Sequence, residues 1–334
     1  MTPSSASSEA SASLNRSVPA GAAGDPGRDH VDPFPGDDSA TRQNRAAFPG
    51  IDSAMQQNNA AFPVVDNAPG QNDAAFPGDG NDSLGVRIAS RVESFREHFG
   101  ISGAVLKTIA VVSMFIDHAG ASLVRRYISL TAGHVTPQQA ALYKQIYYYM
   151  RRIGRLAFPI FCFMIVEGFL HTKDLKKYLS RMLLFAFLSE FPFDYALHHG
   201  QAIFDKQNVY FTLLIGLLVL TGIRAFYGRI PLQLAVMVSG MILARLLKTD
   251  YSYKGVFIIE MLYITRFTRF WQCACGASFM QYYEKMPTPL AFVPIWLYNG
   301  KRGRQHKMLY YFFYPGHLLL LGLLTWHVLP ALLR

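Results

Sequence analysis

The sequence predicts an all-α protein, a polytopic bundle of about eight to ten transmembrane helices preceded by a disordered N-terminal tail. Apolar runs close to the length that a helix needs to cross a bilayer recur from residue 104 onward. The ionisable residues are also divided unevenly. Residues 1–99 hold seven Arg against thirteen Asp and Glu, whereas residues 100–334 hold 25 Lys and Arg against nine Asp and Glu.

The tail, residues 1–84, is polar and repetitive. Ser, Ala, Asn, Asp, Gly and Pro dominate it, so it cannot bury enough apolar surface to offset the entropy of ordering. Phe-Pro recurs there with a period of 14 residues, at Phe34, Phe48, Phe62 and Phe76. These repeats either tether a partner, serve as an export address, or have no function. The tail lacks the apolar core of a signal peptide, so the first membrane helix is expected to direct insertion.

A juxtamembrane segment, residues 85–103, links the tail to the apolar part of the chain. Arg87, Arg91 and Arg96 alternate there with Val, Ile and Phe, a pattern typical of an amphipathic helix on the inner membrane surface. Residues 104–334 are then the transmembrane domain.

This domain contains nine apolar segments that we expect to be helical. Those after residue 254 are short and include prolines, and broken helices are tolerated in membranes where they line a cavity. The nine segments are 104–124, 146–170, 178–198, 208–223, 230–247, 254–266, 270–282, 287–299 and 308–330.

The basic residues between the segments indicate the orientation, because Lys and Arg are retained on the cytoplasmic side of a bilayer. With a cytoplasmic N-terminus, more of them fall in inner loops than in outer loops. The inner residues are Lys173, Lys176, Lys177, Arg224, Arg229, Arg266, Arg269, Lys301, Arg302, Arg304 and Lys307; the outer ones are Arg125, Arg126, Lys144, Lys206, Lys248, Lys254 and Lys285.

Composition and spacing exclude several other classes. Basic clusters between apolar runs differ from the basic polar face of a nucleic-acid-binding protein, so no nucleic-acid partner is expected. The cysteines, Cys162, Cys273 and Cys275, lie in apolar segments and lack the spacing of a zinc site. Neither a disulfide framework nor a bound metal is expected.

Ionisable residues inside the apolar segments are few. Each costs about 2.5–3.5 kcal/mol on insertion scales, so they should face the bundle interior or a wet cavity. Asp117 and His118 are neighbours that point about 100° apart on a helix, so each needs its own partner. A neutral His118 can act as a general base, although a single His in a membrane helix is as often a structural hydrogen bonder. The others are Arg151, Arg152, Arg155, Glu167, His171, Glu190, Arg245, Glu260 and His317.

Arg151 and Arg155 are four residues apart and share a helix face. Two guanidinium groups repel each other there unless an anion lies between them, which indicates a phosphate or carboxylate ligand. Alternatively, Glu190 or Asp117 neutralises them in structural ion pairs.

Five motifs follow one another along the membrane domain: KTIAVVSMFIDHAG at 107–120, RRIGRLAFPIFCFMIVEGFLHT at 151–172, FTLLIGLL at 211–218, YNGKRG at 298–303 and FYPGHL at 313–318. Together they resemble the TraX family over about residues 107–325. The resemblance implies a multi-pass acetyltransferase of the bacterial inner membrane that acetylates the N-terminal amine of pilin. The TraX family is similar in arrangement to membrane acyltransferases that act on sugars. The family pattern leads us to expect two glycines in the stretch DYSYKG, which holds only Gly255.

The resemblance assigns residues where a motif matches. It points to Asp117, His118, Arg151, Arg155 and Glu167 as catalytic residues. It places the donor, acetyl-CoA, near Lys301, Arg302 and His317. Alternatively, the basic loop with Lys301 and Arg302 only determines the membrane topology. The other candidate site for the phosphates of the donor is the pair of Arg151 and Arg155. The acceptor is a pilin amine, another protein, or a hydroxyl of a glycan.

In the mechanism that we expect, His118 deprotonates the acceptor, and Arg151 or Arg155 stabilises the oxyanion. Two other classes of function are kept. A transporter or proton-coupled channel would use the same Asp, His and Glu residues as a relay. A non-enzymatic pilus assembly factor would hold its precursor through the tail.

Overall fold

The computed structural model describes residues 84–198, 206–304 and 307–334, all of which lie in one compact unit. The described chain is helical, and extended pairing within it is limited to isolated bridges. The all-α bundle predicted from the sequence is confirmed. The predicted disorder and the Phe-Pro repeats of the tail fall on residues 1–83, outside the described part, so they stay predictions.

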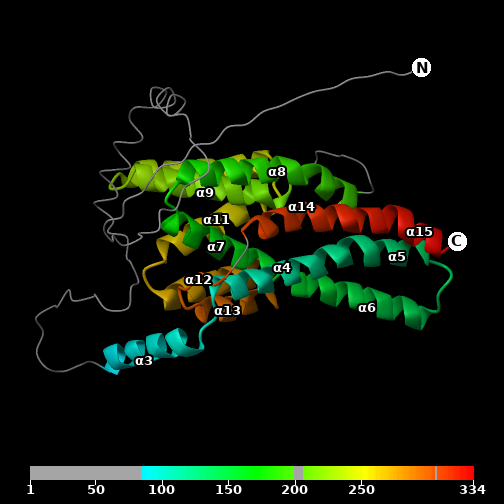
Figure 1. Ribbon diagram of the computed structural model, residues 1–334, viewed down its shortest axis with the longest axis horizontal. Coiled ribbons are helices and arrows are strands. Elements are labelled where there is room, and N and C mark those ends of the chain that lie inside the picture. The colour runs from blue at the N-terminus through cyan, green and yellow to red at the C-terminus, as the bar shows by residue number, and fades with distance from the viewer. Residues whose placement is uncertain (1–83, 199–205, 305–306) are drawn as a thin grey trace, which may run out of the picture. The chain divides into compact units, whose positions relative to one another are not determined.

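The helices follow the predicted segments closely (Figure 1). They are α3 (Leu84–Phe99), α4 (Gly103–Ala119), η1 (Gly120–Val124), α5 (Arg125–Leu130), α6 (Pro137–Gly154), α7 (Ala157–His171), α8 (Leu175–Leu197), α9 (Val209–Ala225), α10 (Ile230–Leu246), α11 (Ser252–Ile264), α12 (Arg269–Tyr283), η2 (Thr288–Ala291), α13 (Phe292–Trp296), α14 (Lys307–Leu323), η3 (Leu324–Val328) and α15 (Leu329–Leu332).

Three helical stretches of the described chain are long and apolar enough to cross a membrane, and they identify a membrane protein. These are Gly103–Leu130, Pro137–His171 and Met308–Leu332. α9 and α10 are also apolar but have 17 residues each, about 25 Å. They are therefore slightly shorter than a hydrocarbon core of about 30 Å.

Two of the long stretches begin or end beyond the predicted segments. α6 starts at Pro137, well before the apolar run, because Thr136 and Gln139 form a capping box and Pro137 occupies the first helical turn. The first stretch includes the π-helical turn η1 and continues past its predicted end through α5. A second π-helical turn, η3, packs against η1 from the C-terminal helix.

The core of the bundle is formed by α7, α9 and α11. Nearly every residue in the middle of α7 is buried, as is most of α9. The largest fully buried side chains include Phe163 and Phe169 of α7, Leu217 of α9 and Ile259 of α11. α4, α8 and α10 pack against this centre, and α6 and α14 in turn contact α4 and α8.

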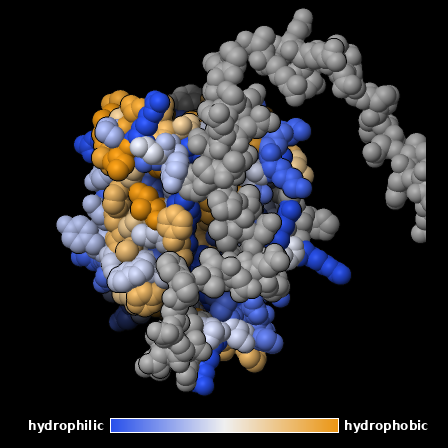
Figure 2. All heavy atoms as spheres, turned by 90° about the vertical axis from the view of Figure 1, so that its left-hand side faces the viewer, coloured by the Kyte–Doolittle hydropathy of each residue, from blue (hydrophilic) through white to orange (hydrophobic). Residues whose placement is uncertain are grey.

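Loops from distant parts of the sequence meet at one end of the bundle, at the left in Figure 1. Backbone hydrogen bonds join the chain before α4 to the loop after α13. Arg269 of α12 lies 3.8 Å from Glu167 of α7, and Arg224 of α9 lies 5.7 Å from the centre of the Phe169 ring. We call this the basic end, because its loops and helix ends hold Lys173, Lys176, Lys177, Arg224, Arg229, Arg266, Arg269, Lys301, Arg302 and Arg304. Figure 2 looks onto it and shows strongly hydrophilic side chains beside hydrophobic ones.

The other ends of α9, α10, α11 and α12 lie at a second level, near the C-terminal end of α4. Lys206 pairs there with Asp250 at 2.6 Å, and Arg155 pairs with Glu284. We call this level the central polar layer; it comprises residues 117–118, 151–155, 190–198, 206–208, 249–252, 284–286 and 317. Fifteen residues of α4 separate His118 from Gly103 at the basic end, which corresponds to about 22 Å.

The loop before α11 adopts its turn without the second expected glycine. Ser252 has a φ of 50° and Lys248 a φ of 51°, in the left-handed region that favours glycine. Ser252, within the DYSYKG stretch, therefore adopts a backbone conformation that a glycine would adopt without steric cost.

α4 and α6 approach each other most closely at two glycines. A Cβ atom added to Gly154 would lie 2.1 Å from the Cβ of Asp117, and one added to Gly120 would lie 3.0 Å from the Cβ of Met150. Any larger residue at position 154 must therefore push the helices apart at Asp117.

Replacing Gly154 with Ala is expected to destabilise the protein by about 1–3 kcal/mol, because the added methyl group has no space against α4. Gly316→Ala is the matched control. A Cβ at Gly316 meets no atom within 4 Å, so alanine should leave stability unchanged or raise it by about 0.5–1 kcal/mol. Thermal unfolding in detergent measures the stability of both variants. Labelling of the buried thiols of Cys162 and Cys273 monitors the unfolding. Equal melting temperatures for the two variants would contradict the close approach.

Candidate active site in the central polar layer

Asp117 and Arg151 form an ion pair that joins α4 to α6. Arg151 Nη1 lies 2.5 Å from Asp117 Oδ2, and the two side chains are 29% and 18% exposed, respectively. The same nitrogen lies 3.4 Å from the Asp117 carbonyl. The other carboxylate oxygen, Oδ1, is buried and has no hydrogen-bond partner among the described residues. Asp117 thus has a partner of its own, Arg151, as expected for a residue that points away from its neighbour His118.

The other two arginines of the RRIGR sequence are also paired. Arg155 makes an ion pair with Glu284, which follows α12. Arg152 donates to the Met286 carbonyl and to the Tyr148 hydroxyl at 2.6 and 2.9 Å. Of the alternatives that the sequence leaves open, structural ion pairs are therefore the arrangement observed, with Glu284 in place of Glu190 as the partner of Arg155.

His118 and His317 meet in the middle of the bundle, although 199 residues separate them. Their rings are nearly parallel, with centres 5.0 Å apart and an angle of 12° between the planes. His118 Nδ1 lies 2.7 Å from His317 Nε2. The residues are only 8% and 5% exposed, so this hydrogen bond is shielded from solvent.

The hydrogen-bond pattern determines which nitrogen atoms carry protons when both rings are neutral. His317 Nδ1 lies 2.7 Å from the Phe313 carbonyl, which can only accept, so Nδ1 carries the proton of His317. Its Nε2 is then an acceptor, and His118 Nδ1 must donate to it. A neutral imidazole carries one N–H, so His118 Nε2 is left with its lone pair.

Aromatic side chains enclose the histidine pair. The ring of Tyr314 lies 5.8 Å from that of His118 and 5.7 Å from that of His317. Phe115 and Phe313 contact His317, with ring centres at 6.0 and 4.8 Å. The Tyr314 hydroxyl is buried and has no partner within the described chain. These aromatic side chains therefore shield both histidines from bulk water.

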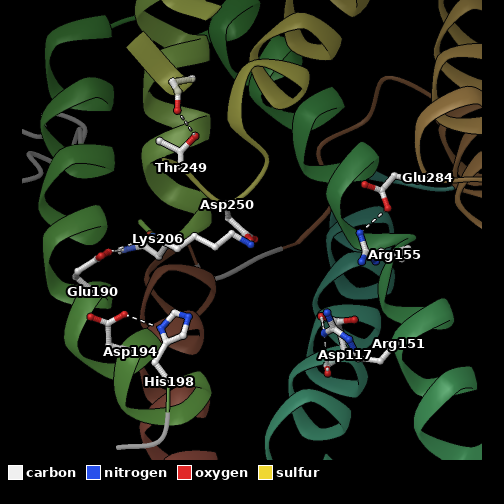
Figure 3. A network of polar contacts seen from close by, with 12 residues as sticks. Asp117, Arg151, Arg155, Glu190, Asp194, His198, Lys206, Thr249, Asp250 and Glu284 are labelled. Atoms are coloured by element: carbon white, nitrogen blue, oxygen red, sulfur yellow. Dashed lines mark hydrogen bonds and ion pairs between the residues drawn. The ribbon is translucent and has the colours of Figure 1, made fainter. Parts of the chain in front are cut away.

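A second polar group lies across the layer on α8, as Figure 3 shows. Glu190 accepts from the side-chain nitrogen of Asn208 at 2.5 Å and from its backbone N–H at 3.2 Å, so it helps to cap the start of α9. Asp194 lies 2.9 Å from His198 Nδ1. Glu190 thus has a structural partner of its own and does not neutralise the arginines.

The remaining residues predicted for the site lie at the basic end instead. Glu167 is close to His171, at 3.9 Å, as well as to Arg269. Lys301 and Arg302 are exposed, and their carbonyls accept from the first N–H groups of α4 at 2.8 and 3.0 Å. The structure thus brings together Asp117, His118, Arg151, Arg155 and His317 in one layer, and places Glu167, Lys301 and Arg302 about 22 Å away along α4.

The sequence could not identify several members of the layer. Glu284 lies after α12 in a loop with no motif, and Tyr314 is one of many tyrosines in the chain. The FYPGHL motif contains both Tyr314 and His317. This motif was therefore the one indication in the sequence that Tyr314 lies at the site. No cluster of metal-ligating side chains is found among the described residues.

The fold and the site define a helical membrane protein with a buried histidine pair next to paired arginines. The family described as TraX protein matches residues 102–325, and the chain belongs to this family. It is also similar to the probable fimbrial assembly protein FimC, serogroup H1, of Dichelobacter nodosus. The two are 26% identical over 244 residues, which cover 65% of this chain and 92% of the relative. No solved structure matches the chain.

The Asp117–Arg151 pair should show strong energetic coupling. In a double-mutant cycle of Asp117→Ala and Arg151→Ala, we expect a coupling free energy of about 1–3 kcal/mol in unfolding, because the groups are largely buried and in direct contact. The exposed pair of Lys177 and Asp174, 3.3 Å apart, is the control, and its coupling should stay below about 1 kcal/mol. Similar coupling in both pairs would show that Asp117 and Arg151 do not stabilise the contact of α4 with α6.

Proposed function

We propose that this protein is an acetyltransferase of the bacterial inner membrane that moves an acetyl group from acetyl-CoA to an amine, with His118 as the general base. The observation that carries the proposal is the hydrogen-bonded histidine pair, which leaves a lone pair on His118 Nε2. Membership of the TraX family supports it. The excess of Lys and Arg at the basic end supports a cytoplasmic orientation for that end and for the N-terminus.

The reaction uses the layer as follows. His118 Nε2 takes the proton of the acceptor ammonium or hydroxyl group, and His317 orients the ring through the bond to Nδ1. The freed lone pair of the acceptor attacks the thioester carbon, and the C–S bond breaks when the tetrahedral intermediate collapses. The leaving sulfur takes up a proton, so CoA departs as its thiol. That proton is the second one of the amine when the acceptor is an ammonium group, and the one held by His118 when the acceptor is a hydroxyl. Arg151 retains N–H groups beyond the one that Asp117 uses, so it can stabilise the oxyanion in a water-poor site.

The acceptor that we favour is the N-terminal amine of a pilin, with a hydroxyl of a glycan as the second choice. The similarity to a probable fimbrial assembly protein supports a role connected with pili. That same description favours a second candidate function, a pilus assembly factor without enzymatic activity. The two differ in whether His118 is required.

A proton-coupled transporter is less well supported by the geometry. The chain of hydrogen bonds runs from His118 to His317 and ends at the Phe313 carbonyl. A backbone carbonyl accepts a hydrogen bond but has no proton to pass on, so this pair does not continue as a relay.

His118→Ala should lower kcat/KM for acetyl transfer at least about 100-fold, as expected for loss of a general base. His317→Ala should lower it less, and His317→Gln should recover part of the loss because an amide oxygen can accept from His118 Nδ1. Thiol release from acetyl-CoA by the purified protein, with a pilin N-terminal peptide as acceptor, measures each effect.

His327→Gln is the control, because His327 lies on the same C-terminal helical stretch and bonds to the Tyr195 hydroxyl instead. Wild-type activity in this variant is expected. If His118→Ala cells assemble normal pili and the purified wild-type protein releases no thiol, the assembly-factor function replaces the enzymatic one.

A further inference from the structure

The basic end contains two arginines whose ion-pair partners are either exposed or distant. Arg96 of α3 has a side chain that is only 12% exposed, and its ion-pair partner, Glu93, is 60% exposed to solvent. Arg269 of α12 is 19% exposed, and its contact with Glu167 is long, at 3.8 Å. Both guanidinium groups are therefore largely removed from water. Neither has a carboxylate partner that is both close and buried.

The two arginines lie at the same loop, the one after α13, although α3 and α12 are far apart in the sequence. The N–H of Gly100 donates to the Arg96 carbonyl, and the Gly100 carbonyl accepts from Asn299 of this loop. Arg269 lies over the ring of Tyr298 in the same loop. Burial, and then the positive charge of Arg269, lower the pKa of Arg96, so the two like charges interact. The Nε of Arg96 is buried and has no hydrogen-bond partner among the described residues. A buried N–H of a cation without an acceptor is costly, and an anion at this position would satisfy it.

The surroundings fix this pair in place. Arg269 donates to Gln272 at 2.8 Å and lies over the rings of Phe163 and Tyr298, at 4.8 and 5.5 Å from their centres. The residue after α3 is held by Asn299, whose side-chain nitrogen donates to the Gly100 carbonyl at 3.1 Å. The loop that contains Asn299 then places the exposed Lys301 at the same end.

We propose that Arg96 and Arg269, together with Lys301, bind the phosphate groups at the nucleotide end of the acyl donor. This inference rests on the proposed acetyltransferase function and names the part of the donor that the basic end recognises. Arginine forks match phosphate oxygens and bind them through two N–H groups. The pair uses donors from α3 and α12, so it is distinct from the histidine pair in the central polar layer.

The distance between the two sites restricts the donor further. About 22 Å of α4 separates the basic end from His118, so a small donor such as acetyl phosphate cannot contact both. A thioester carried on a pantetheine arm has its phosphates and its acyl group at opposite ends. The basic end therefore selects a phosphorylated pantetheine thioester, and the central layer performs the transfer.

The test compares donors with and without phosphates in the full-length protein in phosphatidylcholine nanodiscs. Arg96→Gln and Arg269→Gln should each raise KM for acetyl-CoA at least about tenfold and leave kcat unchanged. The KM for S-acetylpantetheine, which lacks the phosphates, should not change. Arg269→Lys should recover part of the loss, because it restores the charge but not the fork. Arg229→Gln removes an exposed charge at the same end and should change neither constant. Equal increases for both donors, or none, would overturn the proposal.

A binding measurement separates this inference from the proposed function. The probe is adenosine 3′,5′-bisphosphate, with adenosine as its uncharged counterpart. The wild-type protein should bind the bisphosphate at least about 100-fold more tightly than adenosine, and both glutamine variants should weaken bisphosphate binding at least about tenfold. Binding without acetyl transfer would uphold the phosphate site and reject the enzyme; acetyl transfer with unselective binding would do the reverse.

Two further outcomes also count against the phosphate site. One is the absence of bisphosphate binding to the wild-type protein, a measurement that does not depend on any variant folding. The other is the loss of that binding when phosphatidylglycerol replaces phosphatidylcholine, since the arginines would then prefer a lipid head group.

Discussion

Much of this structure depends on one constraint: charged groups need hydrogen-bond or ion-pair partners where water is scarce. A charge inside a membrane bundle is tolerated when a partner, a cavity or a backbone carbonyl replaces its hydration. Gly154 makes one such pairing possible, because the absence of a side chain lets α6 approach α4 where Asp117 meets Arg151. Once these two are paired, the adjacent His118 is directed to a different neighbour, and His317 provides it. The geometry of the histidine pair thus depends on how closely two helices approach one another.

Residue patterns in the sequence were sufficient to predict the helices and the ionisable residues inside the bundle. Runs of apolar residues located the helices, and adjacent residues such as Asp117 and His118 necessarily point in different directions. The choice of partner could not be predicted. The sequence offered Asp117 and Glu190 as counterions for the arginines, yet Glu190 caps the start of α9 through Asn208 and Glu284 pairs with Arg155. Such choices follow from which helix ends meet in three dimensions, and spacing along the chain does not encode that.

Position along the helix axis was the other quantity that the motifs did not reveal. Glu167 belongs to the same motif as Arg151 and Arg155, but α7 carries it to the opposite level of the bundle, beside Arg269. The motif therefore spans two regions with different chemistry. One holds a histidine pair among aromatic rings, and the other holds partly buried arginines next to a basic loop. A donor with a long arm reconciles the two, which is why the separation is informative about the substrate class.

The two π-helical turns, η1 and η3, change which side chains each long helix directs toward its neighbours. A π-helical turn contains one residue more than an α-helical turn, so it rotates the side chains that follow relative to those that precede it. In the first long stretch, η1 lies directly after His118. In the C-terminal stretch, η3 lies after His317. Each helix can therefore present one stripe of residues to the core before the turn and a different stripe to its neighbours beyond it. An insertion or deletion of a single residue in either turn would change the register of the outer helical segment while leaving the histidine pair in place.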